Sequence, residues 1–241
     1  MLNTIASVSS FVESNLRWAS ITSEELTTFT LLMFFAILTA LESYCPREKK
    51  PFRQVRQSYR TNISLFLFNS IVLSLASASS LFALAGHYSE TGLLDAIANP
   101  IAKAAISLLL LDLLFYLWHK ASHCFNWLWI FHKVHHNEPH LNVTTAFRIH
   151  VLELAIATLL KAAYIIVLGI DKTIVLTYES LMILFVMFHH ANISFPGEKL
   201  LGKLIIVPYL HRVHHSTIRI EHDSNYGAIL SICWSEECCR L

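Results

Sequence analysis

Long apolar runs separated by polar segments dominate the pattern of this chain. A bilayer core of roughly 30 Å is crossed by about 20 apolar helical residues, and several runs approach that length. The pattern predicts an all-α, polytopic membrane bundle of four to five apolar helices. The alternative, a soluble protein with this many buried helices in succession, is disfavoured. The runs are Phe29–Tyr44, which is expected to begin a few residues earlier, Ile63–Ala85, Ile101–Trp118, Val151–Ile170 and Thr173–Phe188.

Only Asp171 and Lys172 separate the last two runs. So short a joint predicts a tight antiparallel hairpin at 151–188, which either crosses the membrane fully or enters and returns. We expect one membrane domain over 1–241, with the first three spans at 29–118 and a histidine-rich region at 119–232.

Composition supports the membrane interpretation. Of 241 residues, 54% are hydrophobic and 15% charged, whereas soluble domains carry about 25% charged residues. Mean hydropathy is +0.50. The net charge of +1 excludes the basic footprint of a nucleic-acid binder. The five cysteines show no CxxC pair or disulfide framework, and the polar first 28 residues show no cleavable signal.

Charges in the loops orient the bundle. Between the first two spans, six basic residues face one acid, Glu48, whereas the loop Gly86–Pro100 contains no Lys or Arg. The positive-inside rule then makes the basic loop cytoplasmic. Counting crossings onward also places His119–His150 and the segment from His189 on the cytoplasmic side. The loop could instead dock an acidic electron donor. Its basic residues are Arg47, Lys49, Lys50, Arg53, Arg56 and Arg60.

Histidine is the unusual residue type, with 14 copies, most of them between His119 and His215. Residues three or four apart share a helix face, so three motifs can each project imidazoles together. Eight imidazoles are too many for one tetrahedral zinc and suit two ions with four or five ligands each. Ligand type leaves Fe, Cu, Ni and Zn open, and scattered structural histidines are the plainer alternative. The motifs are His119-x-x-x-His123, His132-x-x-His135-His136 and His211-x-x-His214-His215.

The order of these motifs resembles the fatty acid hydroxylase/sterol desaturase superfamily, from about Trp118 to Ile232. Three further segments are similar to family elements: Thr145–Glu153, Phe188–Asn192 and Asp223–Gly227. The tail at 233–241 departs from the family pattern, as a truncation or alternative ending would.

The resemblance implies a di-iron centre, with zinc as an adventitious substitute. His190 would be a ninth ligand and is preferred to His189, which points about 100° away on a helix. Ligating imidazoles need partners that orient the second ring nitrogen. The implied ligands are His119, His123, His132, His135, His136, His190, His211, His214 and His215, and the candidate orienting residues are Asp112, His150, Glu153, Asn192 and Asp223.

Several side chains keep a plainer interpretation. Asp112 could equally be a hydrogen-bond partner between helices, and His150 could face lipid headgroups. His140 and His222 are expected at the surface, and His87 far from any site. Aromatic residues at 118–131 read as an interfacial belt or as a wall along the path of the substrate.

The resemblance implies an oxidoreductase that hydroxylates or desaturates a lipid, such as a sterol or fatty acyl chain. It would use O2 and two electrons from an external ferredoxin or b-type cytochrome with its reductase. A membrane metal transporter or sensor is the alternative, but its ligands would lie near mid-membrane. A metal-dependent hydrolase is a weaker alternative.

Overall fold

The computed structural model describes residues 23–75, 81–89 and 91–231. Within them the chain is helical, with one isolated β-bridge between Ile205 and Leu230. The long helices are α2 (Ser23–Tyr44), α3 (Phe52–Leu75), α5 (Pro100–Cys124), α7 (Val151–Leu168) and α8 (Lys172–His190), and the short ones are α4 (Leu81–Tyr88), η1 (Leu93–Ala96), α6 (Asn126–His136), η2 (Val143–Phe147), α9 (Glu198–Leu201), α10 (Pro208–His214) and α11 (Arg219–His222). The predicted all-α class is confirmed.

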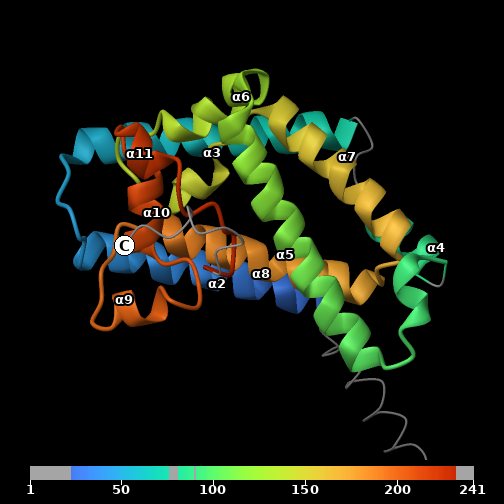
Figure 1. Cartoon of the computed structure of the whole chain (residues 1–241). Helices are drawn as coiled ribbons and strands as arrows, with labels where there is room; N and C mark the ends of the chain where they lie inside the picture. Colours follow the sequence, from blue (N-terminus) through green and yellow to red (C-terminus); the bar gives the residue numbers. More distant parts are fainter. Residues whose placement is uncertain (1–22, 76–80, 90, 232–241) are drawn as a thin grey trace, which may run out of the picture.

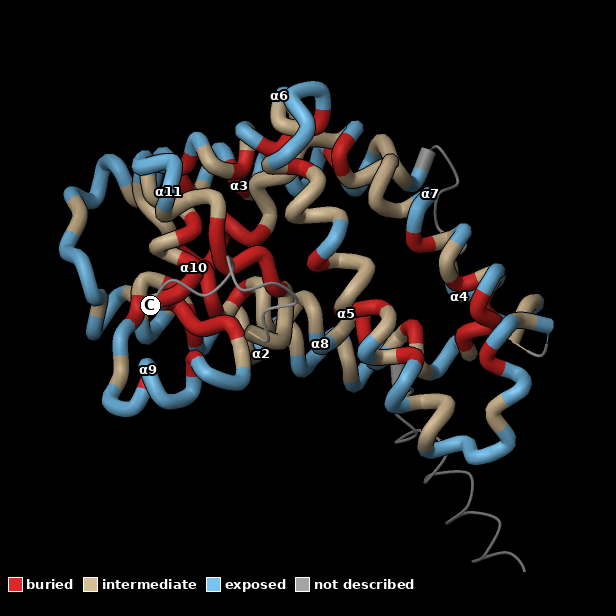
Figure 2. The backbone as a smooth tube through the Cα atoms, in the orientation of Figure 1, coloured by how far each residue is buried: buried red, intermediate tan, exposed pale blue. Residues whose placement is uncertain are grey.

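Four described helices are long and apolar enough to cross a membrane: Glu25–Tyr44 within α2, and α5, α7 and α8. Many of their large apolar side chains, such as Phe29, Ile101 and Leu159, are exposed. Figure 2 shows that buried residues concentrate around α10 and the adjoining end of α8, while α7 is mostly exposed or intermediate. Apolar helices with exposed apolar faces indicate an integral membrane protein.

The predicted span Ile63–Ala85 is not one helix. It divides between α3, which ends at Leu75, and α4, which begins at Leu81; residues 76–80 lie outside the described part. The first half of α3 is polar, with Arg53, Arg56 and Arg60 in its first three turns, so α3 is not among the candidate spans. The apolar run therefore begins inside a helix that starts as a polar one.

Capping residues explain where the other spans begin and end. Asn99 accepts hydrogen bonds from the backbone N–H groups of Ile101 and Ala102, directly before Pro100 at the first position of α5. α7 ends at Leu168 and is capped by Gly169, whose φ of 68° suits glycine. Asp171 then caps α8 by accepting from Thr173 N. Two long helices, α7 and α8, therefore flank the short joint, but they diverge from it rather than packing side by side (Figure 1), and the ion pair between Lys161 and Glu179 joins them.

The bundle has two distinct ends, which Figure 1 shows. One end, which we call the histidine end, contains the C-terminal ends of α5 and α8 and the short helices α6 and α10. The loop between α2 and α3 is also here, because Arg47 N donates to Asn192 O just after α8, at 2.9 Å. At the other, the far end, η1 meets the α7–α8 joint so closely that a Cβ on Gly92 would lie 2.0 Å from Gly169 N. The basic loop and the histidine motifs thus share one end of the bundle.

Candidate metal centre

Four helices bring the histidine motifs together at the histidine end. The first motif occupies the last two turns of α5, and the second lies on α6, directly after the sharp turn at Phe125. His190 is the last residue of α8. The third motif lies on α10, with His215 as its C-cap. The helices that carry these residues therefore come from segments up to about a hundred residues apart in sequence.

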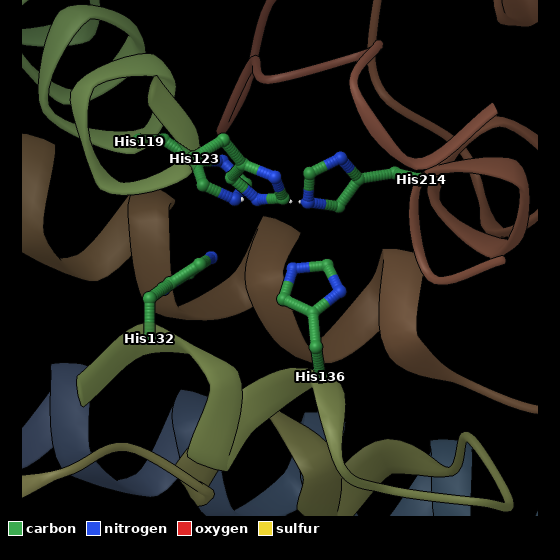
Figure 3. Close-up of side chains that lie close together, drawn as sticks. All are labelled: His119, His123, His132, His136 and His214. Atoms are coloured by element: carbon green, nitrogen blue, oxygen red, sulfur yellow. Dashed lines mark hydrogen bonds between the residues drawn. The ribbon is translucent and has the colours of Figure 1, made fainter. Parts of the chain in front are cut away.

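The nine candidate ligands fall into two groups, and in each the ring nitrogens lie within 4.8 Å of one another. Figure 3 shows the larger, whose side chains point toward one another from α5, α6 and α10. The smaller draws on α6, α8 and α10. We call them the five-histidine group (His119, His123, His132, His136 and His214) and the four-histidine group (His135, His190, His211 and His215).

Helix geometry decides how each motif divides. On α6, His132 and His136 are four residues apart and face the five-histidine group, while His135 turns to the other. On α10 the assignment is reversed, because His211 and His215 join the four-histidine group and His214 faces the larger one. Each short helix therefore contributes to both groups, and adjacent histidines belong to different groups.

Backbone carbonyls orient four of the nine candidate ligand rings. The Nδ1 atoms of His119, His190 and His214 lie 2.9, 2.7 and 2.7 Å from the carbonyl oxygens of Tyr226, Val186 and Ser224. His135 Nδ1 lies 3.3 Å from the carbonyl oxygen of Arg148. A carbonyl only accepts, so Nδ1 is the protonated nitrogen in these rings and Nε2 keeps its lone pair.

Those lone pairs face one another. His214 Nε2 and His119 Nε2 are 2.9 Å apart, and His190 Nε2 and His135 Nε2 are 3.0 Å apart. A second proton could relieve this repulsion, but burial lowers the pKa of His135 to about 3 and that of His214 well below its usual value. A cation between the nitrogens is the remaining way to compensate the lone pairs.

The dimensions fit a metal ion. The four Nε2 atoms of the four-histidine group form a closed ring of contacts of 2.9 to 3.1 Å. The centre of a flat ring of this size would lie about 2.1 Å from each nitrogen, which is the length of a metal–imidazole bond. In the five-histidine group, both ring nitrogens of His123 and His136 and the Nε2 of His132 are buried without a hydrogen-bond partner. Both groups therefore present the unpaired imidazole donors that a metal ion needs.

Two of the five candidate orienting residues contact a ligand candidate. Glu153, in the first turn of α7, lies with its Oε1 2.7 Å from His132 Nδ1, and both side chains are nearly buried. Asp223 Oδ1 lies 3.5 Å from His123 Nδ1. Burial lowers the pKa of His132 to about 3, so its ring is neutral and Nε2 is free to coordinate.

The other three orienting candidates have different partners. Asp112 accepts from the backbone N–H groups of Ile229 and Leu230 at 3.3 and 3.4 Å, so it ties the C-terminal segment to α5. Asn192 hydrogen-bonds to the backbone of Glu48. His150 caps α7 by accepting from Leu152 N. Each is satisfied by backbone groups, which sequence spacing could not reveal.

Sequence reasoning also missed two residues at the histidine end. His222, expected at the surface, has a side chain only 19% exposed and a ring 4.8 Å from that of His123. Glu42, at the end of α2, accepts from Val143 N and Asn192 N, both at 2.7 Å, and from Tyr59 Oη at 2.9 Å. The acidic position at the end of an apolar span was the available signal for Glu42. For His222, the only signal was that it lies close in sequence to the third histidine motif.

A buried polar network supports the carbonyl that faces His135. The Arg148 guanidinium donates to Asn62 Oδ1 at 3.1 Å and to Val134 O at 2.8 Å, and lies 3.6 Å from the Glu138 carboxylate. Glu138 also accepts from Asn62 Nδ2 at 3.0 Å. These contacts connect α3 to the segment after α6 and hold the Arg148 backbone in place. In the sequence, Arg148 stands out only as part of the family-like segment Thr145–Glu153.

The family model for fatty acid hydroxylases matches residues 104–237, which include every histidine of both groups. The chain belongs to the fatty acid hydroxylase family. The match runs into the tail at 233–241, which lies outside the described residues. The resemblance recognised from the histidine motifs is thereby confirmed.

Curated relatives of this family member are lipid-hydroxylating enzymes by name. It is 31% identical over 128 residues to alkylglycerol monooxygenase of Caenorhabditis elegans, covering 52% of this chain and 24% of the relative. It is 27% identical over 138 residues to ornithine lipid hydroxylase OlsE of Rhizobium tropici, covering 57% and 41%. Human alkylglycerol monooxygenase is 27% identical over 128 residues, covering 52% and 27%. The chain thus spans less than half the length of these relatives, and no solved structure matches it.

Proposed function

We propose that the protein is an integral-membrane oxidoreductase that hydroxylates a lipid, using two iron ions, O2 and two electrons from an external donor. The observation that supports this proposal is the pair of histidine groups, with five and four members, at one end of an apolar helical bundle. Two iron ions, when bound, would supply the activation of O2 and the oxidation of a lipid C–H bond. The nine histidines of the two groups are the proposed ligands.

The residues of the chain prepare this site in several ways. The carbonyls and Glu153 fix which nitrogen of each oriented ring is free. Burial lowers the pKa of His132 and His135 to about 3, so these two imidazoles are neutral and no proton has to leave before a metal binds. Exposed apolar side chains on α5 and α7, such as Leu117 and Leu159, give a lipid chain a compatible surface beside the site. The protein therefore contributes orientation and a dry environment.

The histidine end is proposed to face the cytoplasm. The loop between α2 and α3, together with the first three turns of α3, carries six basic residues against one acid, and the loop contacts the segment directly after α8. A cytoplasmic reductase system, with a ferredoxin or b-type cytochrome, could then deliver electrons. The lipid substrate would enter from the bilayer. Hydroxylation is favoured over desaturation by the names of the relatives.

Metal analysis combined with product analysis tests the proposal. The protein, expressed with ample iron and purified in detergent, should contain about two iron ions per chain. With a reductant and candidate lipids, including an alkylglycerol and an ornithine lipid, it should incorporate one atom of 18O from labelled O2 into the product. His135→Ala should lose this activity, whereas His87→Ala, an exposed histidine on α4 near the far end, should keep it.

Three results would contradict the proposal. Less than one iron per chain together with full activity in His135→Ala would remove the metal role. Lipid conversion that does not depend on oxygen would indicate a hydrolase. Metal uptake into proteoliposomes without any lipid oxidation would favour the transporter alternative, although neither histidine group lies in the middle of a candidate span.

A further inference from the structure

A third cluster of metal-binding side chains adjoins the five-histidine group. It comprises His123, His222 and Asp223, whose potential ligand atoms all lie within 4.8 Å of one another. Asp223 Oδ1 is 3.3 Å from His222 Nε2 and 3.5 Å from His123 Nδ1. Two imidazoles and one carboxylate form a donor set that binds divalent transition metals such as Fe2+.

The donor atoms of this cluster remain available. Arg219 Nε lies 3.2 Å from Asp223 Oδ2, so the ion pair engages one carboxylate oxygen while Oδ1 faces the two imidazoles. The side chain of His123 is fully buried, and neither of its ring nitrogens has a hydrogen-bond partner. A neutral imidazole has one nitrogen lone pair, so His123 can offer that donor to either site in turn.

Exposure differs sharply across the cluster. The side chains of His222 and Asp223 are 19% and 33% exposed, whereas that of His123 is 0% exposed. The ring of His222 also lies 5.2 Å from that of His136, a second member of the five-histidine group. An ion arriving from water would therefore meet His222 and Asp223 first and find buried imidazoles directly behind them.

We propose that His123, His222 and Asp223 form a third, solvent-accessible site for a divalent metal ion, through which ions enter the five-histidine group. The proposal rests on the proposed function only in that the five-histidine group holds a metal. Ions bind here more weakly than in the buried groups, because the site offers three protein ligands and its carboxylate is partly neutralised by Arg219. Weak binding is what a transfer site requires, since a tightly held ion would not move on.

Cobalt titration of the full chain tests this. The detergent-purified protein is stripped with a chelator and titrated with CoCl2, while bound ions are counted by mass spectrometry after equilibrium dialysis. Wild type should bind two ions tightly and a third more weakly. His222→Ala should bind the two tight ions only, and the tight ions should enter more slowly than in wild type, because the exposed imidazole that first meets the ion is gone. His87→Ala, which removes an exposed histidine elsewhere, should match wild type in both count and rate.

The outcomes separate this inference from the proposed function. Three results would overturn the entry site alone. Wild type could bind two tight ions without a third, or His222→Ala could retain the third ion. The tight ions could also enter His222→Ala as fast as they enter wild type. Loss of a tight ion in His222→Ala would also overturn it, because His222 would then be a ligand of the five-histidine group itself. A wild-type chain that binds no ion tightly would remove the basis of both proposals.

Discussion

Replacing Glu153 should weaken one metal ion and spare the other. Its Oε1 accepts a hydrogen bond from His132 Nδ1 at 2.7 Å, with both side chains less than a tenth exposed. A hydrogen bond to a charged group is worth about 1.5–3 kcal/mol and a neutral one about 1 kcal/mol. At an alkaline pH, where the Glu153 carboxylate is ionised, Glu153→Gln keeps an acceptor but loses the charge, so the expected loss is about 1.4 kcal/mol, or tenfold in affinity.

Truncation should cost more than neutralisation. Glu153→Ala leaves the Nδ1–H of His132 without its partner in a buried position, which adds about 1–3 kcal/mol. The combined loss is about 100-fold, the upper end of the range for residues that orient metal ligands. Only the five-histidine group contains His132, so the four-histidine group should retain its ion.

Competition with a chelator of known affinity measures both effects. The protein is loaded with Co2+ and titrated with the chelator, and the two ions are followed as separate steps of release. Glu48→Gln is the matched control, because this carboxylate is exposed and pairs with Lys50 at the surface. Equal weakening of both ions, or no weakening in Glu153→Ala, would refute the assignment of Glu153 to one site.

Three further outcomes concern stability. Gly92→Ala should lower the melting temperature by several degrees, because its Cβ would lie 2.0 Å from Gly169 N. Gly86→Ala is the control, because a Cβ there would have no atom within 4 Å. Equal melting temperatures of the two variants would contradict the packing at the far end. Lys161→Met breaks the 2.5 Å ion pair with Glu179 between α7 and α8 and should lower the stability of the protein. Adding Glu179→Leu should recover much of the lost stability. No recovery would show that the uncompensated Glu179 charge is not the cause. Removing bound metal with a chelator should lower the melting temperature reversibly, since facing lone pairs are then uncompensated, and an unchanged transition would count against two metal sites.

Much of the architecture follows from local sequence patterns. Apolar runs of bilayer length identified α2, α5, α7 and α8, and the Asp171–Lys172 joint marked the boundary between α7 and α8. The prediction of one span over 63–85 was wrong, because hydropathy does not show that α3 begins with a polar, arginine-containing segment or that a separate helix follows it. Apolar content marks where a chain can enter a membrane, not where one helix stops and the next begins.

The candidate site was predictable in its members but not in its arrangement. Helical spacing nominated the histidines, because a motif on one helix is a local property. Whether His135 or His136 faces a given group depends on where α5 and α8 lie relative to α6, which spacing cannot show. Asp112 illustrates the same limit, because its position two turns before His119 suggested a role at the metal, while a backbone segment distant in sequence occupies its carboxylate.

The division of adjacent histidines between the two groups would make two bound ions cross-links of the fold. α6 has 11 residues and α10 has 7, both shorter than the ~12–15 residues at which isolated helices become marginally stable in water. Each would be fastened at neighbouring residues to two ions, which also fasten it to α5 and to α8. Metal supply would then govern how long the protein survives proteolysis in the cell, before it governs how fast any lipid is oxidised.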